Sequence, residues 1–422
     1  AVSSSLGLSR LRSGDRVFIK PNIVFWTRYA PFPKWGIITT SRILEDMIIL
    51  LKENGITDIM LGEGPVVHPQ DKETPNHAFT ALGYETFRKR YGIRYFSIFD
   101  RPFKSVDLGE GVILNMNRDA LESDFIVNLP VLKTHAQTMV SLGIKNLKGL
   151  IDIASRKKCH SPDPDRDLHF MISHLAESMP PMLTLIDGIY SNERGPGPDG
   201  KIHRSNLLVA SSDVLSADLV GAKILGYPPG SVPYLAHAAM RHNRPSDLSD
   251  IQIFGEPLDS VSMPHAYDFP FGSDENGNIL PVPLLKLGIR GISFRKYDST
   301  LCTYCAAISG LVLTAIRNAW EGNPFDEVEI LTGKCMEPTP GKKKTILLGK
   351  CMSRKHRNHP GISERFAVPG CPPDPRDIVD AFQKAGVLVA PELFEFPDRF
   401  PAFFMERYKN RPEFDESFFT AG

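Results

Sequence analysis

The sequence predicts an α/β protein with a mainly parallel sheet and helices on both faces, followed by a smaller α+β domain that contains cysteines. Two observations predict this fold. Short apolar runs alternate with helical patterns in the first half of the 422 residues, and five of the six cysteines fall between residues 302 and 371. We expect a first domain over 1–290, irregular over 226–290, a cysteine domain over 291–390 and a tail over 391–422.

The first elements along the chain form a strand–helix–strand unit. Residues 16–19 favour a strand, Thr40 and Ser41 offer helix N-caps, and the apolar residues that follow recur at helical spacing up to Gly55. The strand expected next covers 57–61. The same reasoning predicts strands at 125–129, 183–186, 207–210, 328–331 and 345–348, and helices at 167–178, 213–225 and 303–319.

Composition and charge exclude some classes of protein. Lys plus Arg and Asp plus Glu number 49 each, so no overall positive charge recruits nucleic acid. No apolar stretch approaches the roughly 20 residues that span a bilayer. The first 15 residues lack the pattern of a secretory signal, although a start at Ala1 leaves open a removed segment. Six cysteines are too few for a disulfide scaffold, and we expect a reducing, cytoplasmic location.

The cysteine spacing predicts a metal centre. Cys302 and Cys305 begin a helical pattern three residues apart, so both thiols lie on one helix face. Cys351 follows Gly-Lys, and Cys371 lies in Gly-Cys-Pro-Pro; a glycine beside a ligand lets backbone N–H groups approach cluster sulfur. Four thiolates suit a [4Fe-4S] cluster, which we predict at Cys302, Cys305, Cys351 and Cys371.

Other interpretations of these cysteines stay open. Structural zinc prefers two C-x-x-C pairs, a redox disulfide needs only one pair, and lone cysteines are often inert. Cys335 is the first substitute ligand, and Cys159 is expected to be a structural thiol. Eight Lys and Arg residues against only Glu337 lie between Gly333 and His359. They form either a docking surface for an acidic electron-transfer partner or a solvated loop.

A second set of polar residues follows predicted strands. Ligands of open parallel sheets bind beyond the carboxyl ends of the strands. Several lysines, a histidine and carboxylates there predict a pocket for a small anionic ligand, with proton transfer by His135, Lys133 and Asp187. The ligand-binding residues expected are Lys20, Asn22, Glu63, Lys145 and Asn146. Ordinary surface charges and turns are the alternative.

These residues give the chain a family resemblance. Lys20-Pro-Asn22, the run from Leu129 through Lys133-Thr-His135 to Gly149, His169, and Asp187-Gly188 with Gly195-Pro196 resemble the DUF362 family over roughly residues 15–225. Many members carry a C-terminal ferredoxin module, whereas the cysteines here are dispersed. The Gly-Cys-Pro-Pro segment is similar to cluster-binding segments of hydrogenase small subunits and a related respiratory complex subunit. The resemblance implies an iron–sulfur protein without a defined substrate.

Three functional hypotheses follow. The first is a redox protein, a candidate oxidoreductase, whose cluster exchanges electrons with the anionic ligand or a protein partner. The second is a non-redox isomerase or lyase that uses His135 and the lysines, with the metal as a structural element. The third is a binding or assembly module without catalysis.

Overall fold

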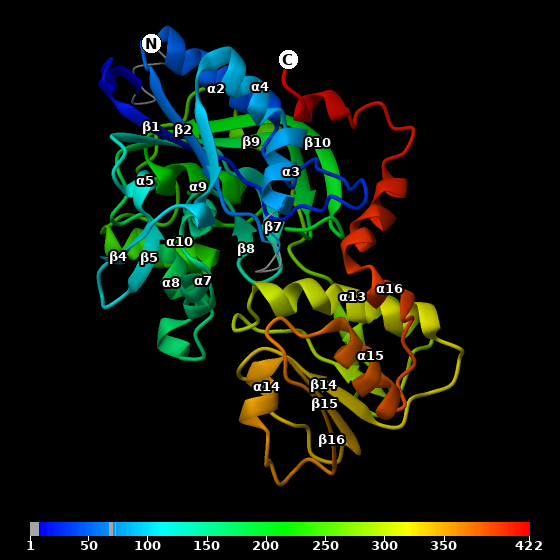
Figure 1. The fold of residues 1–422 in the computed structure, drawn as a ribbon. Helices are drawn as coiled ribbons and strands as arrows, with labels where there is room; N and C mark the ends of the chain where they lie inside the picture. Colours follow the sequence, from blue (N-terminus) through cyan, green and yellow to red (C-terminus); the bar gives the residue numbers. More distant parts are fainter. Residues whose placement is uncertain (1–7, 67–70, 72) are drawn as a thin grey trace. The chain divides into compact units, whose positions relative to one another are not determined.

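A computed structural model describes residues 8–66, 71 and 73–422. The chain forms two compact units. Unit 1 contains the described residues up to 159 together with 169–268 and 401–422, and unit 2 contains 160–168 and 269–400. Figure 1 shows the elements of both units.

Unit 1 is built on an eight-stranded sheet with the order β3-β2-β1-β6-β9-β7-β8, and β10 pairs with β9. β7 with β8 and β9 with β10 are antiparallel, and the remaining pairs are parallel. The strands are β1 (Arg16–Lys20), β2 (Asp58–Glu63), β3 (Arg94–Ser97), β6 (Phe125–Asn128), β7 (Val131–His135), β8 (Met139–Ser141), β9 (Met182–Glu193) and β10 (Lys201–Ser211), with a separate hairpin of β4 (Phe103–Asp107) and β5 (Ile113–Asn117).

Helices accompany the strands of unit 1. They are α2 (Ser41–Glu53), α3 (Glu73–Ala81), α4 (Tyr84–Tyr91), α5 (Arg118–Leu121), α6 (Gly143–Asn146), α7 (Ile153–Cys159), α8 (Leu168–Ser173), α9 (Val214–Ile224), α10 (Pro233–Arg241) and α11 (Leu258–Val261). The Thr40 hydroxyl accepts a hydrogen bond from the Ile43 N–H and caps α2. Asp213 caps α9 through the Ser216 N–H, and α9 packs on β9 and β10.

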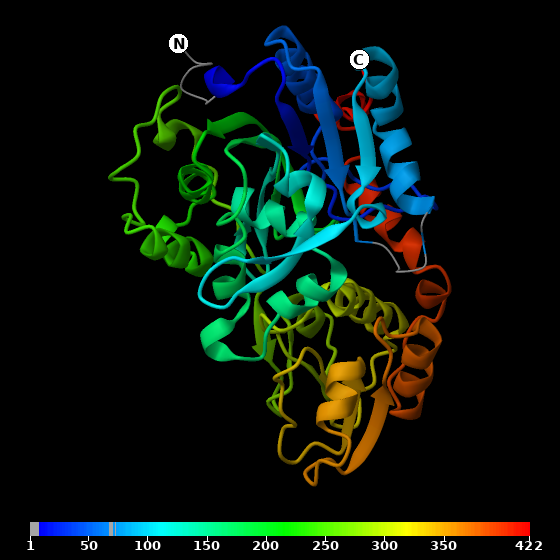
Figure 2. The same cartoon turned by 60° about the vertical axis from the view of Figure 1, so that its left-hand side comes forward.

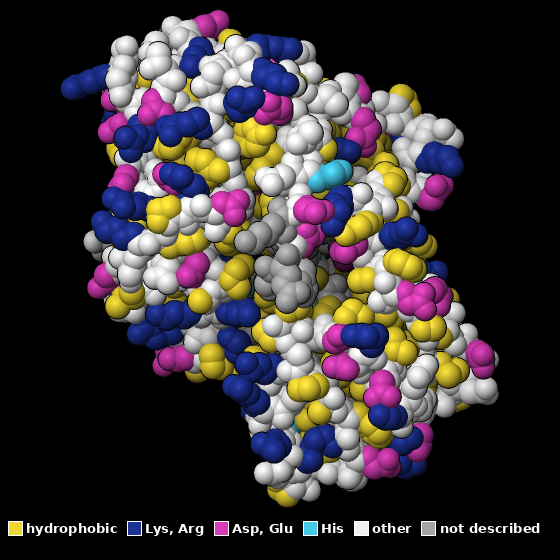
Figure 3. Space-filling model, in the orientation of Figure 1, with side chains coloured by type: hydrophobic (Ala, Val, Ile, Leu, Met, Phe, Trp, Pro, Cys, Tyr) yellow, Lys and Arg dark blue, Asp and Glu magenta, His cyan; other side chains and the backbone are white. Residues whose placement is uncertain are grey.

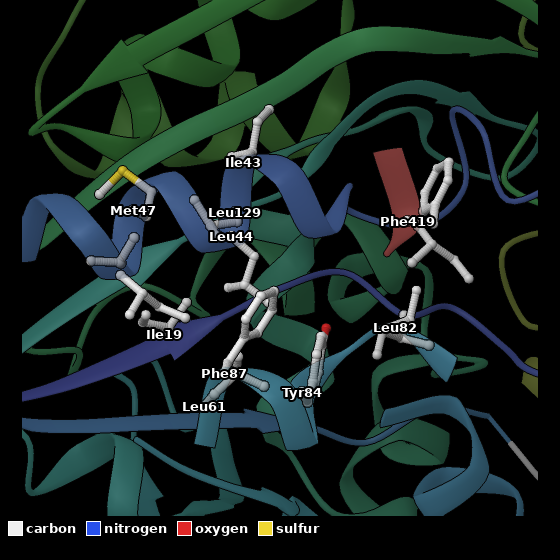
Figure 4. Packing of buried hydrophobic residues seen from close by; sticks show 14 of the residues in the cluster. Ile19, Ile43, Leu44, Met47, Leu61, Leu82, Tyr84, Phe87, Leu129 and Phe419 are labelled. Atoms are coloured by element: carbon white, nitrogen blue, oxygen red, sulfur yellow. The ribbon is translucent and has the colours of Figure 1, made fainter. Parts of the chain in front are cut away.

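The core of unit 1 explains why its strands are apolar on both faces. α2 buries Ile43, Leu44 and Met47 in one cluster with side chains of β1, β2 and β6 (Figure 4). The alternate residues Phe18 and Met60 point to the opposite face and are equally buried. A parallel sheet buried on both faces requires near-continuous apolar strands, and these runs supply them.

The C-terminal segment 401–422 completes this core. Phe414 and Phe419 belong to the same buried cluster as α2, and η7 (Glu416–Phe419) packs against α2. Figures 1 and 2 show the end of this red segment beside the blue elements of unit 1. This part of the predicted tail therefore contributes to a hydrophobic core.

Unit 2 contains a four-stranded parallel sheet with the order β13-β14-β15-β16. It is an α/β arrangement, where α+β was expected. Its elements are β11 (Phe271–Ser273), β12 (Ile279–Pro281), α12 (Val282–Lys286), β13 (Ile292–Phe294), α13 (Thr303–Ala319), β14 (Val328–Leu331), β15 (Lys344–Leu348), α14 (Lys350–Lys355), β16 (Glu364–Val368), α15 (Pro375–Lys384) and α16 (Glu392–Glu395). α13 and α15 bury apolar faces on this sheet.

The predicted α/β fold class is confirmed, with some differences in the elements. β9 runs to Glu193, so Asp187 lies in mid-strand rather than at a strand end. Lys133 and His135 belong to a separate strand, β7, and do not lie in a loop after β6. The helix expected over 167–178 covers only 168–173. No helix within the described ranges combines the length and apolarity needed to cross a bilayer.

Candidate functional site

A buried ion pair lies at the carboxyl ends of β1 and β2. Lys20 Nζ is 2.6 Å from Glu63 Oε2, and both side chains are almost fully buried. Glu63 also accepts hydrogen bonds from the backbone N–H groups of Ile23 and Gly64. A Cβ on Gly149 would lie 2.6 Å from Lys20 Nζ and 2.7 Å from Glu63 Oε1, so a side chain there would displace the ion pair. The pair is thus held closely on all sides.

An amide network extends from this pair. Asn146 Oδ1 accepts from Asn22 Nδ2 at 2.8 Å, and Lys133 Nζ donates to Asn22 Oδ1 at 2.5 Å. Asn146 Nδ2 donates to Asn128 Oδ1 at 2.8 Å. The structure therefore brings together five predicted residues: Lys20, Asn22, Glu63, Lys133 and Asn146. The sequence reasoning missed Asn128 and Gly149, although Asn128 ends an apolar strand and that polar ending was a usable signal.

Burial and the charges of neighbouring lysines disfavour the protonated forms of Lys133 and Lys145. Burial, assisted by the neighbouring Lys20 charge and opposed by Glu63, lowers the pKa of Lys133 to about 7. Burial, Lys148 and Lys133 all lower the pKa of Lys145. Within the described part of the chain, the Lys145 ammonium makes no hydrogen bond or ion pair. We call Lys20, Lys133, Lys145 and Lys148 with Glu63 the lysine site.

Asp187 and His135 have other neighbours. The carboxylate of Asp187 accepts hydrogen bonds from the backbone N–H groups of Thr40 (2.8 Å) and Ile189 (3.1 Å), and burial raises its pKa to about 6. It thereby connects β9 to the start of α2. His135 ends β7, and its Nδ1 accepts from the Gln137 N–H at 3.1 Å. Neither contact joins these residues to the ion pair.

The four predicted cluster cysteines lie at one edge of the sheet in unit 2. Cys302 is the N-cap residue of α13 after β13, and Cys305 lies in the first turn of that helix. Cys351 is the second residue of α14, three residues after Leu348 ends β15, and Cys371 follows the end of β16 at Val368. Since all four strands are parallel, their carboxyl ends meet at this edge. This topology explains how cysteines from 302 to 371 reach one region.

The thiols influence one another electrostatically. A hydrogen bond with Cys305 lowers the pKa of Cys302 to about 6, assisted by the N–H groups at the start of α13 and by the charge of Lys334. The pKa of Cys305 is raised by its hydrogen bond to Cys302, by burial and by the charges of Cys351 and Cys371. A Cβ on Gly349 would lie 3.1 Å from Cys305 Sγ. The four thiols therefore share one neighbourhood.

The remaining cysteines differ from this set. Cys335 follows β14 and its thiol donates to the carbonyl of Pro162 at 3.7 Å. Cys159 is fully buried in unit 1. Next to Cys351, the side chains of Lys350, Arg354, Lys355 and Arg357 are exposed. Figure 3 shows Lys and Arg side chains gathered over the part of unit 2 that carries α14.

Comparison with known proteins concerns mainly unit 1. Residues 17–223 match the model of a domain of unknown function, DUF362. A thylakoid-associated protein of Synechocystis sp. is 29% identical over 233 residues, which cover 54% of this chain and 68% of the relative. The matched range contains every residue of the lysine site and ends before Cys302. Residues 17–223 therefore form a domain that matches the DUF362 family.

Proposed function

We propose that this chain is an iron–sulfur protein that transfers electrons, with a [4Fe-4S] cluster held by Cys302, Cys305, Cys351 and Cys371. The observation that carries the proposal is the common position of these four thiols at the carboxyl edge of one parallel sheet. When bound, such a cluster supplies one-electron transfer. The protein supplies thiolates, the N–H groups that begin α13 and the close approach of Gly349.

The donor set favours a cluster over a single zinc ion. Tetrahedral zinc with Zn–S bonds of ~2.3 Å holds its thiolates about 4 Å apart. Among the described residues, no three cysteine sulfur atoms all lie within 4.8 Å of one another. Although Cys302 and Cys305 are hydrogen-bonded neighbours, the four thiols are not all at the spacing of one tetrahedral ion, which favours the larger four-iron cube. The exposed basic residues beside Cys351 would receive a partner protein with an acidic surface.

Anaerobic purification followed by absorbance and iron and sulfide analysis tests the cluster. We expect a brown protein with about four iron and four sulfide per chain. Cys351→Ser and Cys371→Ser should each lose most of the iron. Cys159→Ser and Cys335→Ser are matched controls and should keep it. A colourless protein with one zinc per chain, or equal loss in all four variants, contradicts the proposal.

A second candidate function is acid–base chemistry on a small anion at the lysine site. It is supported by Lys133, whose pKa of about 7 makes its amine able to accept or donate a proton near neutrality. Lys145 offers a second buried amine, which has no hydrogen-bond or ion-pair partner among the described residues. If this function holds, Lys133→Met and His135→Ala should abolish turnover while the absorbance spectrum stays intact. Turnover that survives both substitutions excludes it.

A further inference from the structure

Three side chains of unit 2 that lie outside both candidate sites present metal-binding atoms to one another. Glu337, His356 and His359 each offer one ligand atom, and these atoms all lie within 4.8 Å of one another. Glu337 follows β14, whereas the two histidines follow α14. We propose that Glu337, His356 and His359 bind a divalent transition-metal ion of the Zn²⁺ class.

The buried histidine provides the strongest argument. His356 is 1% exposed, and its Nδ1 has no hydrogen-bond partner among the described residues. Leaving a buried polar nitrogen unpaired is unfavourable, so such atoms usually have a partner. Glu337 Oε2 lies 3.9 Å from this Nδ1, too far for a hydrogen bond. The nitrogen therefore faces the carboxylate across a space that a metal ion can bridge.

The opposite ring nitrogen fixes the tautomer that a metal needs. His356 Nε2 lies 2.8 Å from the carbonyl oxygen of Met336 and donates its proton to it. Nδ1 then carries the lone pair, an arrangement common to metal-binding histidines. Met336 is held by a small apolar core with Leu331, Leu347, Met352 and Ile362, so its carbonyl position is well defined. The sequence folds this ring into one orientation.

The other two proposed ligands, Glu337 and His359, are more exposed than His356. Glu337 is exposed, and its Oε1 forms an ion pair with Lys355 Nζ at 2.6 Å, which leaves Oε2 on the side of His356. His359 Nδ1 accepts from the Gly361 N–H at 3.1 Å, and its ring lies 5.3 Å from that of His356. Metal bonds of about 2.1 Å require a modest approach of these ligands, which rotation of the Glu337 side chain can supply.

The ligand types define the metal class. Two imidazoles and one carboxylate suit Zn²⁺, Co²⁺ or Fe²⁺ and disfavour Mg²⁺ and Ca²⁺, which prefer all-oxygen ligands. Three protein ligands leave coordination positions for water. Lys355 opposes the ion by its positive charge, so removing that charge should strengthen binding.

Titration of the chelator-treated 422-residue protein with Co²⁺, followed by visible absorbance, tests this site. Nitrogen and oxygen ligands give weak d–d bands, whereas thiolates give intense charge transfer, so Co²⁺ at the cysteines is recognised separately. We expect one Co²⁺ with d–d bands in the wild type. Glu337→Gln and His359→Ala should each weaken its binding at least tenfold, and Lys355→Gln should tighten it.

His242→Ala is the matched control, because His242 is a half-exposed histidine that pairs with Glu177 in unit 1. It should leave the titration unchanged. Both Glu337 and His359 reach the surface, so circular dichroism should show these variants folded. Binding that is unaffected by both ligand substitutions, or Co²⁺ bound only through thiolates, overturns the proposal.

Discussion

At the scale of single residues, the lysine site depends on Gly149, which a search for charged residues in the sequence does not find. The buried Lys20–Glu63 pair occupies the space where a Cβ of residue 149 would lie. Gly149→Ala should therefore force the pair apart and lower the free energy of unfolding by about 3 kcal/mol, measured by urea denaturation. Gly14→Ala is the control, since a Cβ there meets nothing within 4 Å. Equal stability of the two variants contradicts this account.

The protonation of Lys133 predicts the pH dependence of anion binding. Its pKa of about 7 means that the ammonium is charged below that pH and neutral above it. An anion binds the charged form, so affinity should be highest below pH 7 and fall by up to tenfold per pH unit above it. Sulfate is a suitable calorimetric probe because its own charge stays constant over this range.

The matched variants for this experiment are Lys133→Met and Lys201→Met. The first removes the titrating group and should flatten the pH profile as well as weaken binding. The second removes an exposed lysine of β10 and should leave both unchanged. An unaltered pH profile in Lys133→Met would show that another group controls binding.

At the scale of elements, the turn from β15 to α14 determines the access to Cys305. Gly349 adopts a φ of 91°, which side-chain-bearing residues rarely tolerate, and its missing Cβ leaves room for Cys305 Sγ. Gly349→Ala should lower the iron content severalfold under anaerobic purification. Gly310→Ala on α13, where a Cβ meets nothing within 4 Å, should retain full iron. Full iron in Gly349→Ala would show that this turn is unimportant for the cluster.

Elements with a strong local pattern were predictable, and those defined by distant contacts were not. The apolar runs at β1, β2, β6 and β14 and the helical period of α13 specify their own structure. β16, with the sequence Glu-Arg-Phe-Ala-Val, was missed because most of its residues are exposed, as in a loop, and only pairing with β15 makes it a strand. The extension of β9 past Asp187 likewise depends on its pairing with β10.

The candidate sites also divide into features that local sequence patterns predict and features that depend on contacts between distant residues. Residue types and spacing selected Lys20, Lys133 and the four cysteines as candidates, because those signals are local. The Met336 carbonyl that orients His356 follows a different strand, so no spacing rule links them. Asp187 was assigned a catalytic role from its residue type, and its bonds to Thr40 and Ile189 became visible only in the fold.

At the scale of the whole molecule, the chain leaves unit 1 and returns to it. Residues 401–422 place Tyr408, Phe414 and Phe419 in the core of unit 1 after the chain has formed unit 2. The Trp35 indole donates to the Asp415 carbonyl at 3.1 Å, and the Tyr190 hydroxyl donates to the Glu413 carbonyl at 3.0 Å. The stability of unit 1 therefore depends on the last residues of the chain.

Single substitutions in this segment measure that dependence. Phe414→Ala and Phe419→Ala each remove a buried ring, so each should lower the free energy of unfolding of unit 1 by about 3–5 kcal/mol. Tryptophan fluorescence during urea denaturation reports the change, because the rings of Trp35 and Phe414 lie 5.3 Å apart. Phe403→Ala, which removes an exposed ring of the same segment, should change the value by less than about 0.5 kcal/mol. If all three variants match the wild type, the segment only covers the surface, and the core of unit 1 is complete without it.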